Sequence, residues 1–192
     1  AYRARFQIES ELIASLPKAQ SYLFVLSPDD GSTLAWQAHG FTAIVYHTFV
    51  IDPGLDEKAL WSGMRDKTRN LIRRAQDTLK VETIDAARFM ASYLSAYGGT
   101  IDAEHRERVL RLSEAAIGHG QGRALAAIDA DGREHAAVLF VWDAKDYYFY
   151  LATREPGPSD PGAMSLLVWH GMLDAAGRGL RFDFDGVTSR NR

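Results

Sequence analysis

The last seventy or so residues carry the pattern that most constrains the fold of this 192-residue chain. Three apolar, β-rich runs are followed by a loop rich in Gly and Pro, a helical run and one more apolar run. The turn Asp131-Gly132 separates the first two runs, and Gly177 and Gly179 end the helix. This order places backbone N–H groups of a loop at a helix N-terminus, which suits phosphate. The predicted elements are strands at 124–129, 135–142 and 146–153, the loop at 154–162, a helix at 163–176 and a strand at 180–185.

The first fifty residues predict a helix followed by strands. Apolar residues recur at helical spacing from Phe6 to Leu16, and Pro17 ends the run. Residues 43–51 (AIVYHTFVI) form the strongest predicted strand in this part. A helix leading into strands in this way is typical of the second half of a domain that begins upstream. The other predicted elements are a strand at 21–26, a turn at 28–31 and a segment at 33–37 that pairs back.

A long amphipathic helix is predicted at residues 57–79. Residues 58–80 hold seven Lys or Arg and two Asp, a local charge of +5, so the rest of the chain carries −8. Three arginines spaced by four residues form a ridge beside the apolar face. Such a ridge is either the solvated face of a surface helix or a site for phosphate or RNA backbone. The basic residues predicted to bind are Arg65, Lys67, Arg69 and Arg73.

A short strand and two helices connect this helix to the final strands. The strand is predicted at 81–84, and the helices at 86–97 and 103–117. Gly98-Gly99 separates the two helices, because glycine disfavours a continuous helix.

The composition excludes several kinds of chemistry. The chain has no cysteine, which removes disulfides, thiolate metal sites and thiol nucleophiles. Its six histidines lack the spacing of a metal site, and no Ser/His/Asp arrangement has a nucleophile elbow. No run approaches the roughly 18 apolar residues that cross a bilayer, and no signal peptide opens the chain. The sequence therefore predicts a globular protein without a metal site.

The loop at 154–162 is a candidate site for a donor molecule that carries phosphate. Gly157, Ser159 and Gly162 are its candidate binding residues, because they precede a helix N-terminus. Three prolines in the same loop lack the N–H groups that a phosphate needs. An ordinary surface loop is the alternative interpretation.

Two acidic residues on the last predicted strand are the candidate catalytic groups. Asp183 and Asp185 alternate with phenylalanines, so both carboxylates are expected to face the same side. Such a pair at a strand end can orient an attacking amine or accept its proton. Ion pairs with Arg178 or Arg181 are the structural alternative.

Tyrosines on the predicted strand at 146–153 are candidate substrate contacts. Tyr148 and Tyr150 share a face, so both line a cleft or neither does. Packing with the hydroxyls at the rim is the structural interpretation, and stacking on a substrate or an adenine ring is the functional one.

Several segments resemble the signature stretches of the Fem-type aminoacyltransferases, the bacterial peptidoglycan interpeptide-bridge or methicillin-resistance-factor proteins. These belong to the GNAT-like acyltransferase superfamily. The resemblance runs from about Leu12 to Gly186 and is most specific at 67–75 (KTRNLIRRA) and 182–186 (FDFDG). The other segments that carry it are 40–41 (GF), 46–52 (YHTFVID), 60–61 (LW), 136–140 (AAVLF), 148–150 (YFY), 163–169 (AMSLLVW) and 179–186 (GLRFDFDG).

The resemblance implies an α+β, GNAT-like acyl-CoA N-acyltransferase fold with a mostly antiparallel mixed sheet flanked by helices. It implies an acyl- or aminoacyltransferase that forms an amide on an amine acceptor, without a tightly bound cofactor. The implied donor is aminoacyl-tRNA, the acceptor a cell-wall precursor, and the compartment the cytoplasm. The alternatives are a GNAT enzyme that uses acyl-CoA on a small amine, and a catalytically silent binding module.

The resemblance also implies a division of the chain. Residues 1–80 are expected to be the end of a first GNAT-like half-domain that includes the long basic helix. Residues 81–192 are expected to be a second GNAT-like domain without its C-terminal end, because complete members of the family extend further in both directions.

Overall fold

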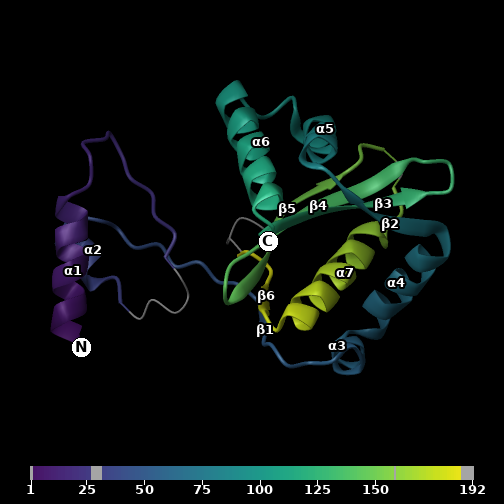
Figure 1. Cartoon of the computed structure of the whole chain (residues 1–192), viewed down its shortest axis with the longest axis horizontal. Coiled ribbons are helices and arrows are strands. Elements are labelled where there is room, and N and C mark those ends of the chain that lie inside the picture. Colours follow the sequence, from purple (N-terminus) through teal and green to yellow (C-terminus); the bar gives the residue numbers. More distant parts are fainter. Residues whose placement is uncertain (1, 27–31, 158, 187–192) are drawn as a thin grey trace. The chain divides into compact units, whose positions relative to one another are not determined.

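The computed structural model describes residues 2–26, 32–157 and 159–186 of the chain (Figure 1). They form two compact units that divide between Tyr46 and His47. The predicted boundary at residue 80 lies within a strand of the second unit. The assignment of residues 1–80 to a first half-domain stays a prediction.

The first unit contains the predicted N-terminal helix but not the predicted strands. Helix α1 spans Tyr2–Ala14 and α2 spans Leu34–Ala38. The prediction of a pairing segment at 33–37 is wrong, because the Gln37 N–H donates to the Thr33 carbonyl, as in a helical turn (3.0 Å). The predicted turn at 28–31 lies outside the described residues.

The predicted strand at 21–26 is also absent from this unit. Alternating apolar residues favour an extended chain, but a strand forms only where a neighbour accepts its hydrogen bonds. The described residues offer this segment no such neighbour. Its aromatic side chains instead join a small cluster, in which the Trp36 ring lies 5.0 Å from that of Phe24 and 5.2 Å from that of Phe41.

The second unit is built on a six-stranded mixed sheet with the order β1-β6-β5-β4-β3-β2. Strands β5 and β6 are parallel and joined through α7, whereas the other four pairings are antiparallel. The predicted α+β fold with a mostly antiparallel sheet is thus confirmed. The strands are β1 Val50–Ile51, β2 Leu79–Ile84, β3 Gly122–Asp129, β4 Glu134–Trp142, β5 Asp146–Arg154 and β6 Arg181–Asp183.

Helices cover both faces of this sheet (Figure 1). On one face lie α3 (Glu57–Gly63), α4 (Asp66–Thr78) and α7 (Ala163–Arg178). On the other lie α5 (Ala86–Tyr97) and α6 (Ala103–Gly118). The alternation of β4 serves both cores: Val138 and Phe140 pack toward α7, whereas Ala137 and Leu139 pack toward α5.

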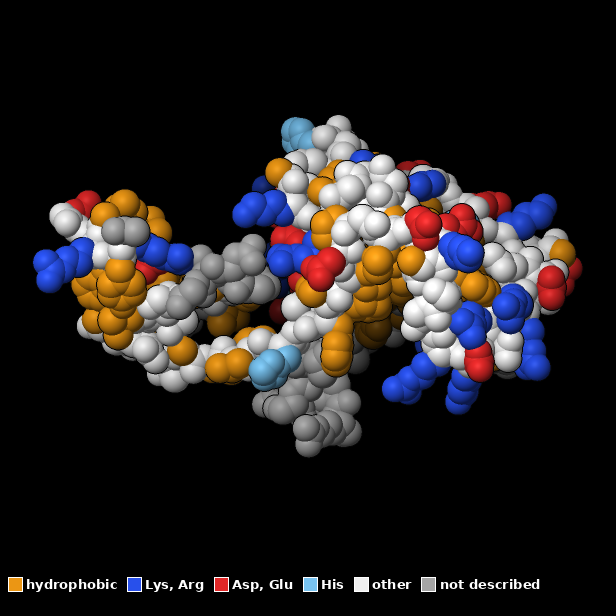
Figure 2. Space-filling model, turned by 90° about the horizontal axis from the view of Figure 1, so that it is seen from below, with side chains coloured by type: hydrophobic (Ala, Val, Ile, Leu, Met, Phe, Trp, Pro, Cys, Tyr) orange, Lys and Arg blue, Asp and Glu red, His pale blue; other side chains and the backbone are white. Residues whose placement is uncertain are grey.

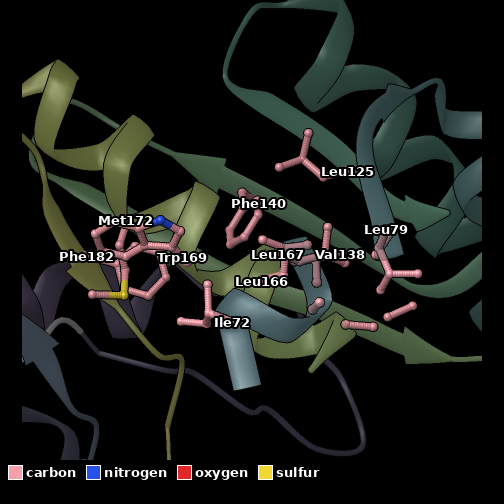
Figure 3. Packing of buried hydrophobic residues seen from close by; sticks show 14 of the residues in the cluster. Ile72, Leu79, Leu125, Val138, Phe140, Leu166, Leu167, Trp169, Met172 and Phe182 are labelled. Carbon is pink, nitrogen blue, oxygen red and sulfur yellow. The ribbon is translucent and has the colours of Figure 1, made fainter. Parts of the chain in front are cut away.

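The larger core lies under α7 (Figure 3). Ile72 from α4, Phe140 from β4 and Phe182 from β6 meet Trp169 and Met172 of α7 there. α7 approaches the sheet so closely that a Cβ on Gly171 would lie 2.4 Å from the Phe140 ring. Glycine at this position therefore permits the contact between the helix and β4.

The predicted helix at 57–79 is wrong in one respect, since it is two helices. Gly63 ends α3, and Met64 and Arg65 are extended, with ψ of 150° and 145°. Arg69 of α4 donates hydrogen bonds to the carbonyls of Trp61 (3.4 Å) and Ser62 (3.2 Å) at the end of α3. The Trp61 carbonyl also accepts a 3.3 Å hydrogen bond from the Met64 N–H, so Arg69 adds to the partners of the carbonyls at the end of α3.

Two predicted strands are shorter than expected. Within the predicted strand at 43–51, β1 holds Val50 and Ile51, which pair with Asp183 and Phe182, and His47 forms an isolated bridge. The predicted strand at 180–185 ends at Asp183, because Asp185 has a positive φ of 56°. In both cases, the residues that do not join the strand lie where the chain enters or leaves the sheet.

Candidate functional site

Strands β5 and β6 pair at one end and separate at the other. Asp146, Tyr147 and Tyr148 of β5 pair with residues 181–183 of β6, and we call this the closed end. Strand β5 then continues to Arg154, and its edge from 149 to 154 has no strand partner on the β6 side within the described ranges. We call residues 149–154 the open half of β5. An unpaired strand edge offers hydrogen bonds to an extended ligand.

A β-bulge lies at the start of the open half. Phe140 of β4 pairs with Phe149, and Leu139 pairs with Leu151, so Tyr150 is an extra residue in β5. Bulges re-aim side chains and are common beside active sites. Phe149 packs toward α7, so Tyr148, which precedes it, faces the opposite layer. Because strand alternation does not hold across the bulge, the shared face of Tyr148 and Tyr150 stays a prediction.

The two tyrosines differ in their surroundings. The Tyr148 hydroxyl lies 3.4 Å from the Asp146 carboxylate, and burial together with the nearby carboxylates of Asp146 and Asp143 raises its pKa to about 12. Tyr148 is therefore a neutral phenol throughout the physiological pH range. Tyr150 is exposed.

Asp183 is buried at the point where the strands separate. Its Oδ1 atom accepts a hydrogen bond from the Thr48 hydroxyl and a second, of 2.8 Å, from the Asp185 N–H. Thr48 in turn accepts a 3.2 Å hydrogen bond from the Gly186 N–H. These bonds tie the chain after β6 to the segment before β1.

Asp185 lies close to Asp183 because the chain turns after β6, and not because the two residues alternate along one strand. Its side chain reaches solvent, yet its carboxyl has no hydrogen-bond or ion-pair partner within the described ranges. Partial burial and the Asp183 carboxylate raise the pKa of Asp185 to about 6. A carboxyl group with this pKa exchanges protons near neutral pH.

The structural alternative assigned these acids to Arg178 or Arg181. Arg178 instead binds Asp174 at 3.1 Å, and Arg181 binds Asp146 at 2.5 and 3.1 Å. The two carboxyls thus remain at the open side of the strand pair. A catalytic role for them stays a prediction.

A hollow lies beside the open half of β5. It has a volume of about 290 Å³ and combines residues of β5 with the end of α5 and the start of α7. The Tyr97 hydroxyl donates to the Ala152 carbonyl across it (3.3 Å). The lining residues are Ala96, Tyr97, Phe149, Ala152, Thr153, Arg154 and Met164.

The loop before α7 is arranged by its own side chains. The Asp160 carboxylate accepts a 2.7 Å hydrogen bond from the Gly162 N–H, at the start of α7. The Asp160 N–H donates to Nδ1 of His135, whose Nε2 atom lies 2.9 Å from the Asp129 carboxylate. A carboxylate of the protein thus occupies a position where a helix N-terminus attracts anions.

The three candidate loop residues lie in different surroundings. Gly162 is buried, and a Cβ there would lie 2.5 Å from the Leu71 carbonyl, so close packing on α4 explains this glycine. Gly157 is exposed with a φ of 101°, and Ser159 is partly buried. A donor-binding role for these residues stays a prediction.

The predicted arginine ridge is divided by the break between α3 and α4. Arg65 precedes α4, Arg69 pairs with Asp66 and binds the end of α3, and Arg73 lies over the Trp61 ring at 5.3 Å. Lys67 and Arg74 are exposed on α4. Figure 2 shows Lys and Arg side chains gathered at this end of the second unit.

Three elements of the site were missed in the sequence. Thr48 carries no pattern that distinguishes it, because its partner Asp183 is 135 residues away. Tyr97 was read only as a helix end. Asp160 did carry a signal, because Asp before a helix is a common capping residue. The prolines around it favoured the interpretation as an ordinary surface loop instead.

No group of three or more His, Asp or Glu able to hold a metal ion occurs within the described ranges. Among the helices that the structure describes, none is long and apolar enough to cross a membrane.

Residues 62–190 match the family model described as an acetyltransferase (GNAT) domain. The chain belongs to this family. No curated protein matches the sequence. The GNAT domain thus identified contains the parallel strand pair, the open half of β5 and α7.

Two solved structures share the fold. One is "Crystal structure of FemX", with a TM-score of 0.61 and 10% identity, covering 73% of this chain and 52% of the other. The second is a conserved protein of unknown function from Bacteroides thetaiotaomicron, with a TM-score of 0.54 and 11% identity, covering 72% and 50%. The GNAT-like fold implied by the resemblance to Fem-type proteins is thus confirmed, and the chain spans about half the length of these neighbours.

Proposed function

We propose that this GNAT acyltransferase-type domain transfers an aminoacyl or acyl group to an amine and forms an amide. The observation that carries the proposal is the separation of β5 from β6, which leaves a strand edge with a hollow beside it and, just after β6 ends, a carboxyl without a partner within the described ranges. Amide formation of this kind depends mainly on positioning, so it needs no enzyme nucleophile.

The chemistry assigns one task to each group. The amine nitrogen forms a bond to the carbonyl carbon of the donor ester while the bond to the ester oxygen breaks. Asp185, mostly ionised at pH 7, takes the proton that leaves the nitrogen and returns it to the leaving oxygen. Partial burial, and after it the neighbouring Asp183 carboxylate, keep Asp185 basic enough for this step.

The surroundings of α7 favour an aminoacyl-tRNA donor over acyl-CoA. The Asp160 carboxylate would repel a pyrophosphate at this helix end, and three prolines remove backbone donors from the same loop. The exposed cations of α4, Lys67 and Arg74, suit the backbone of a nucleic acid. We further propose a peptidoglycan precursor as the acceptor and the cytoplasm as the compartment.

A second candidate is N-acylation of a small amine with acyl-CoA. The family description, an acetyltransferase domain, favours it. A catalytically silent binding module is the third. The three candidates differ in which donor binds and in whether an amide forms.

The test is a panel of donors with the full-length gene product. Aminoacyl-tRNAs and acyl-CoAs are each incubated with an amine-bearing peptidoglycan precursor and with small amines, and amide products are measured by mass spectrometry. Product from aminoacyl-tRNA alone supports the proposal. Product from acyl-CoA alone selects the second candidate, and donor binding without product selects the third.

A matched pair of variants assigns the chemistry. Asp185→Asn is expected to lower the rate about 100-fold, since general base catalysis typically contributes at least that factor. Asp131→Asn, at an exposed turn far from β6 in the strand order, is the control and should leave the rate unchanged.

A further inference from the structure

Thr48 connects two parts of the site that no strand pairing holds together. It precedes β1, and its hydroxyl donates to the Asp183 carboxylate at the end of β6. Its oxygen also accepts from the Gly186 N–H at 3.2 Å. One side chain thus contacts the residues before and after Asp185.

Asp185 itself is held in a conformation that few residues adopt. Its φ of 56° makes it the one non-glycine residue with a positive φ within the described ranges. Its N–H donates to Asp183 at 2.8 Å, which closes a turn over that carboxylate. Backbone in this region persists only where its surroundings fix it, and such residues cluster at active sites.

The two carboxyls are therefore distinguished by their partners. Asp183 accepts two hydrogen bonds on one oxygen, which hold its carboxylate in place. The Asp185 carboxyl has no partner in the part of the chain that the structure describes. The Thr48 hydroxyl thus occupies one carboxylate and leaves the other available for proton transfer.

We propose that Thr48 is a positioning residue for amide formation: it holds Asp183 as the fixed anion and fixes the turn that presents Asp185 to the acceptor amine. This inference rests on the proposed function. Thr48 acts through these two acids and is not assigned any contact with the substrate.

The ionisable groups named around this corner come from β5, from β6 and from the turns beside them. Burial is the larger cause of the raised Asp185 pKa, and the Asp183 carboxylate is the second. Asp183 and Asp143 also act on Tyr148 of β5. Asp146 and Arg181 form an ion pair at the closed end. The turn that keeps the Asp185 carboxyl partly buried beside Asp183 therefore controls its pKa.

The experiment compares Thr48→Val, which keeps the shape and removes the hydroxyl, with Thr48→Ser, which restores it. The Asp185 carboxyl is titrated by carbon-13 NMR in each protein. In Thr48→Val we expect the Asp185 midpoint to fall by about one pH unit, toward that of an ordinary Asp, because the turn that keeps its carboxyl partly buried is released. Thr48→Ser should keep the Asp185 midpoint.

A catalytic measurement accompanies the titration. Thr48→Val should lower kcat about tenfold with little change in KM, and should move the acidic limb of the pH–rate profile with the Asp185 midpoint. An unchanged Asp185 midpoint and pH–rate profile in Thr48→Val would overturn the inference.

The outcomes separate this inference from the proposed function. A moved titration, with no amide from any donor in the parent, would refute the function and leave the link between Thr48 and Asp185 standing. Amide formation by the parent, together with an unchanged pH–rate profile in Thr48→Val, would support the proposed function and refute the link between Thr48 and Asp185. Should Thr48→Val not fold, the Gly186 amide of the parent decides, since exchange at the rate of a free loop amide would contradict the anchoring role.

Discussion

At the closed end of the β5–β6 pair, Asp146 and Arg181 are joined by hydrogen bonds of 2.5 and 3.1 Å, and both side chains are largely buried. At the separated end, the Asp185 carboxyl has no such partner within the described ranges and a pKa of about 6. One end of the strand pair thus holds a complete ion pair, whereas an acid without a partner follows the other end. Charged groups with complete sets of partners serve the fold, whereas a group with a perturbed pKa and no partner is a candidate for a functional role.

The largest expected effect comes from breaking the ion pair at the closed end. Asp146→Asn removes the carboxylate that pairs with the largely buried Arg181 guanidinium, so we expect the free energy of unfolding to fall by about 3 kcal/mol. Urea unfolding measures this. Lys145→Ala, at an exposed neighbour, should change it by less than about 0.5 kcal/mol. A fall in the free energy of unfolding of Asp146→Asn as small as that of Lys145→Ala would contradict the contrast between the two ends.

The next effect tests the packing of α7 over the sheet beside the same strands. Gly171→Ala places a methyl 2.4 Å from the Phe140 ring, and such overpacking should cost about 2 kcal/mol. Gly177→Ala, on the same helix with nothing within 4 Å, should stabilise by about 0.5 kcal/mol through helix propensity. Thermal melting should show a lower melting temperature for Gly171→Ala and a higher one for Gly177→Ala. A change in the same direction for both variants would contradict the close approach of α7.

The same contrast applies to the basic residues of α4. Arg69 binds the carbonyls at the end of α3, so Arg69→Ala should cost about 1 kcal/mol of stability. The double variant Lys67→Ala/Arg74→Ala should leave melting unchanged, weaken tRNA binding and flatten its dependence on salt. Arg108→Ala, on α6 across the sheet, is the control. Unchanged binding in the double variant would make this surface an ordinary solvated face.

The smallest effect concerns stability at the separated end. The raised pKa of Asp185 means that its charged form is disfavoured in the fold, so its contribution to stability is most favourable below the unfolded-state pKa and is lost as pH rises through about 6. Asp185→Asn should therefore be more stable than the parent at pH 7.5, by at most about 1 kcal/mol because solvent screens the charge. The difference should vanish below pH 4. A less stable variant at pH 7.5 would show that the carboxylate has a partner.

The sequence predicted the second unit well and the first unit poorly, for a physical reason. Turns such as Asp131-Gly132 and Gly98-Gly99 separate runs of clear periodicity, so the pattern alone predicts β3, β4, α5 and α7. At Ser21 to Leu26 the same alternation produced no strand, because pairing depends on a neighbour that the local sequence does not specify.

The site shows a similar division. The acids Asp183 and Asp185 were predicted from their spacing, but the reason for their proximity was wrong, since a turn rather than a strand brings them together. The break after Gly63 was hidden because the apolar face continues from α3 into α4. The contact of Thr48 with Asp183 could not be predicted, because a hydrogen bond between residues 135 positions apart leaves no local sequence pattern.

The most direct measurement is amide hydrogen exchange with and without a bound donor, using a non-hydrolysable aminoacyl-tRNA analogue and, separately, acyl-CoA. We predict that the donor that binds protects residues 149–154 of β5 and the first turn of α7. The amides of β3, on the far side of β4, should exchange at unchanged rates. Saturating binding that leaves residues 149–154 unprotected would contradict the claim that the separation of β5 and β6 is the acyl-transfer site.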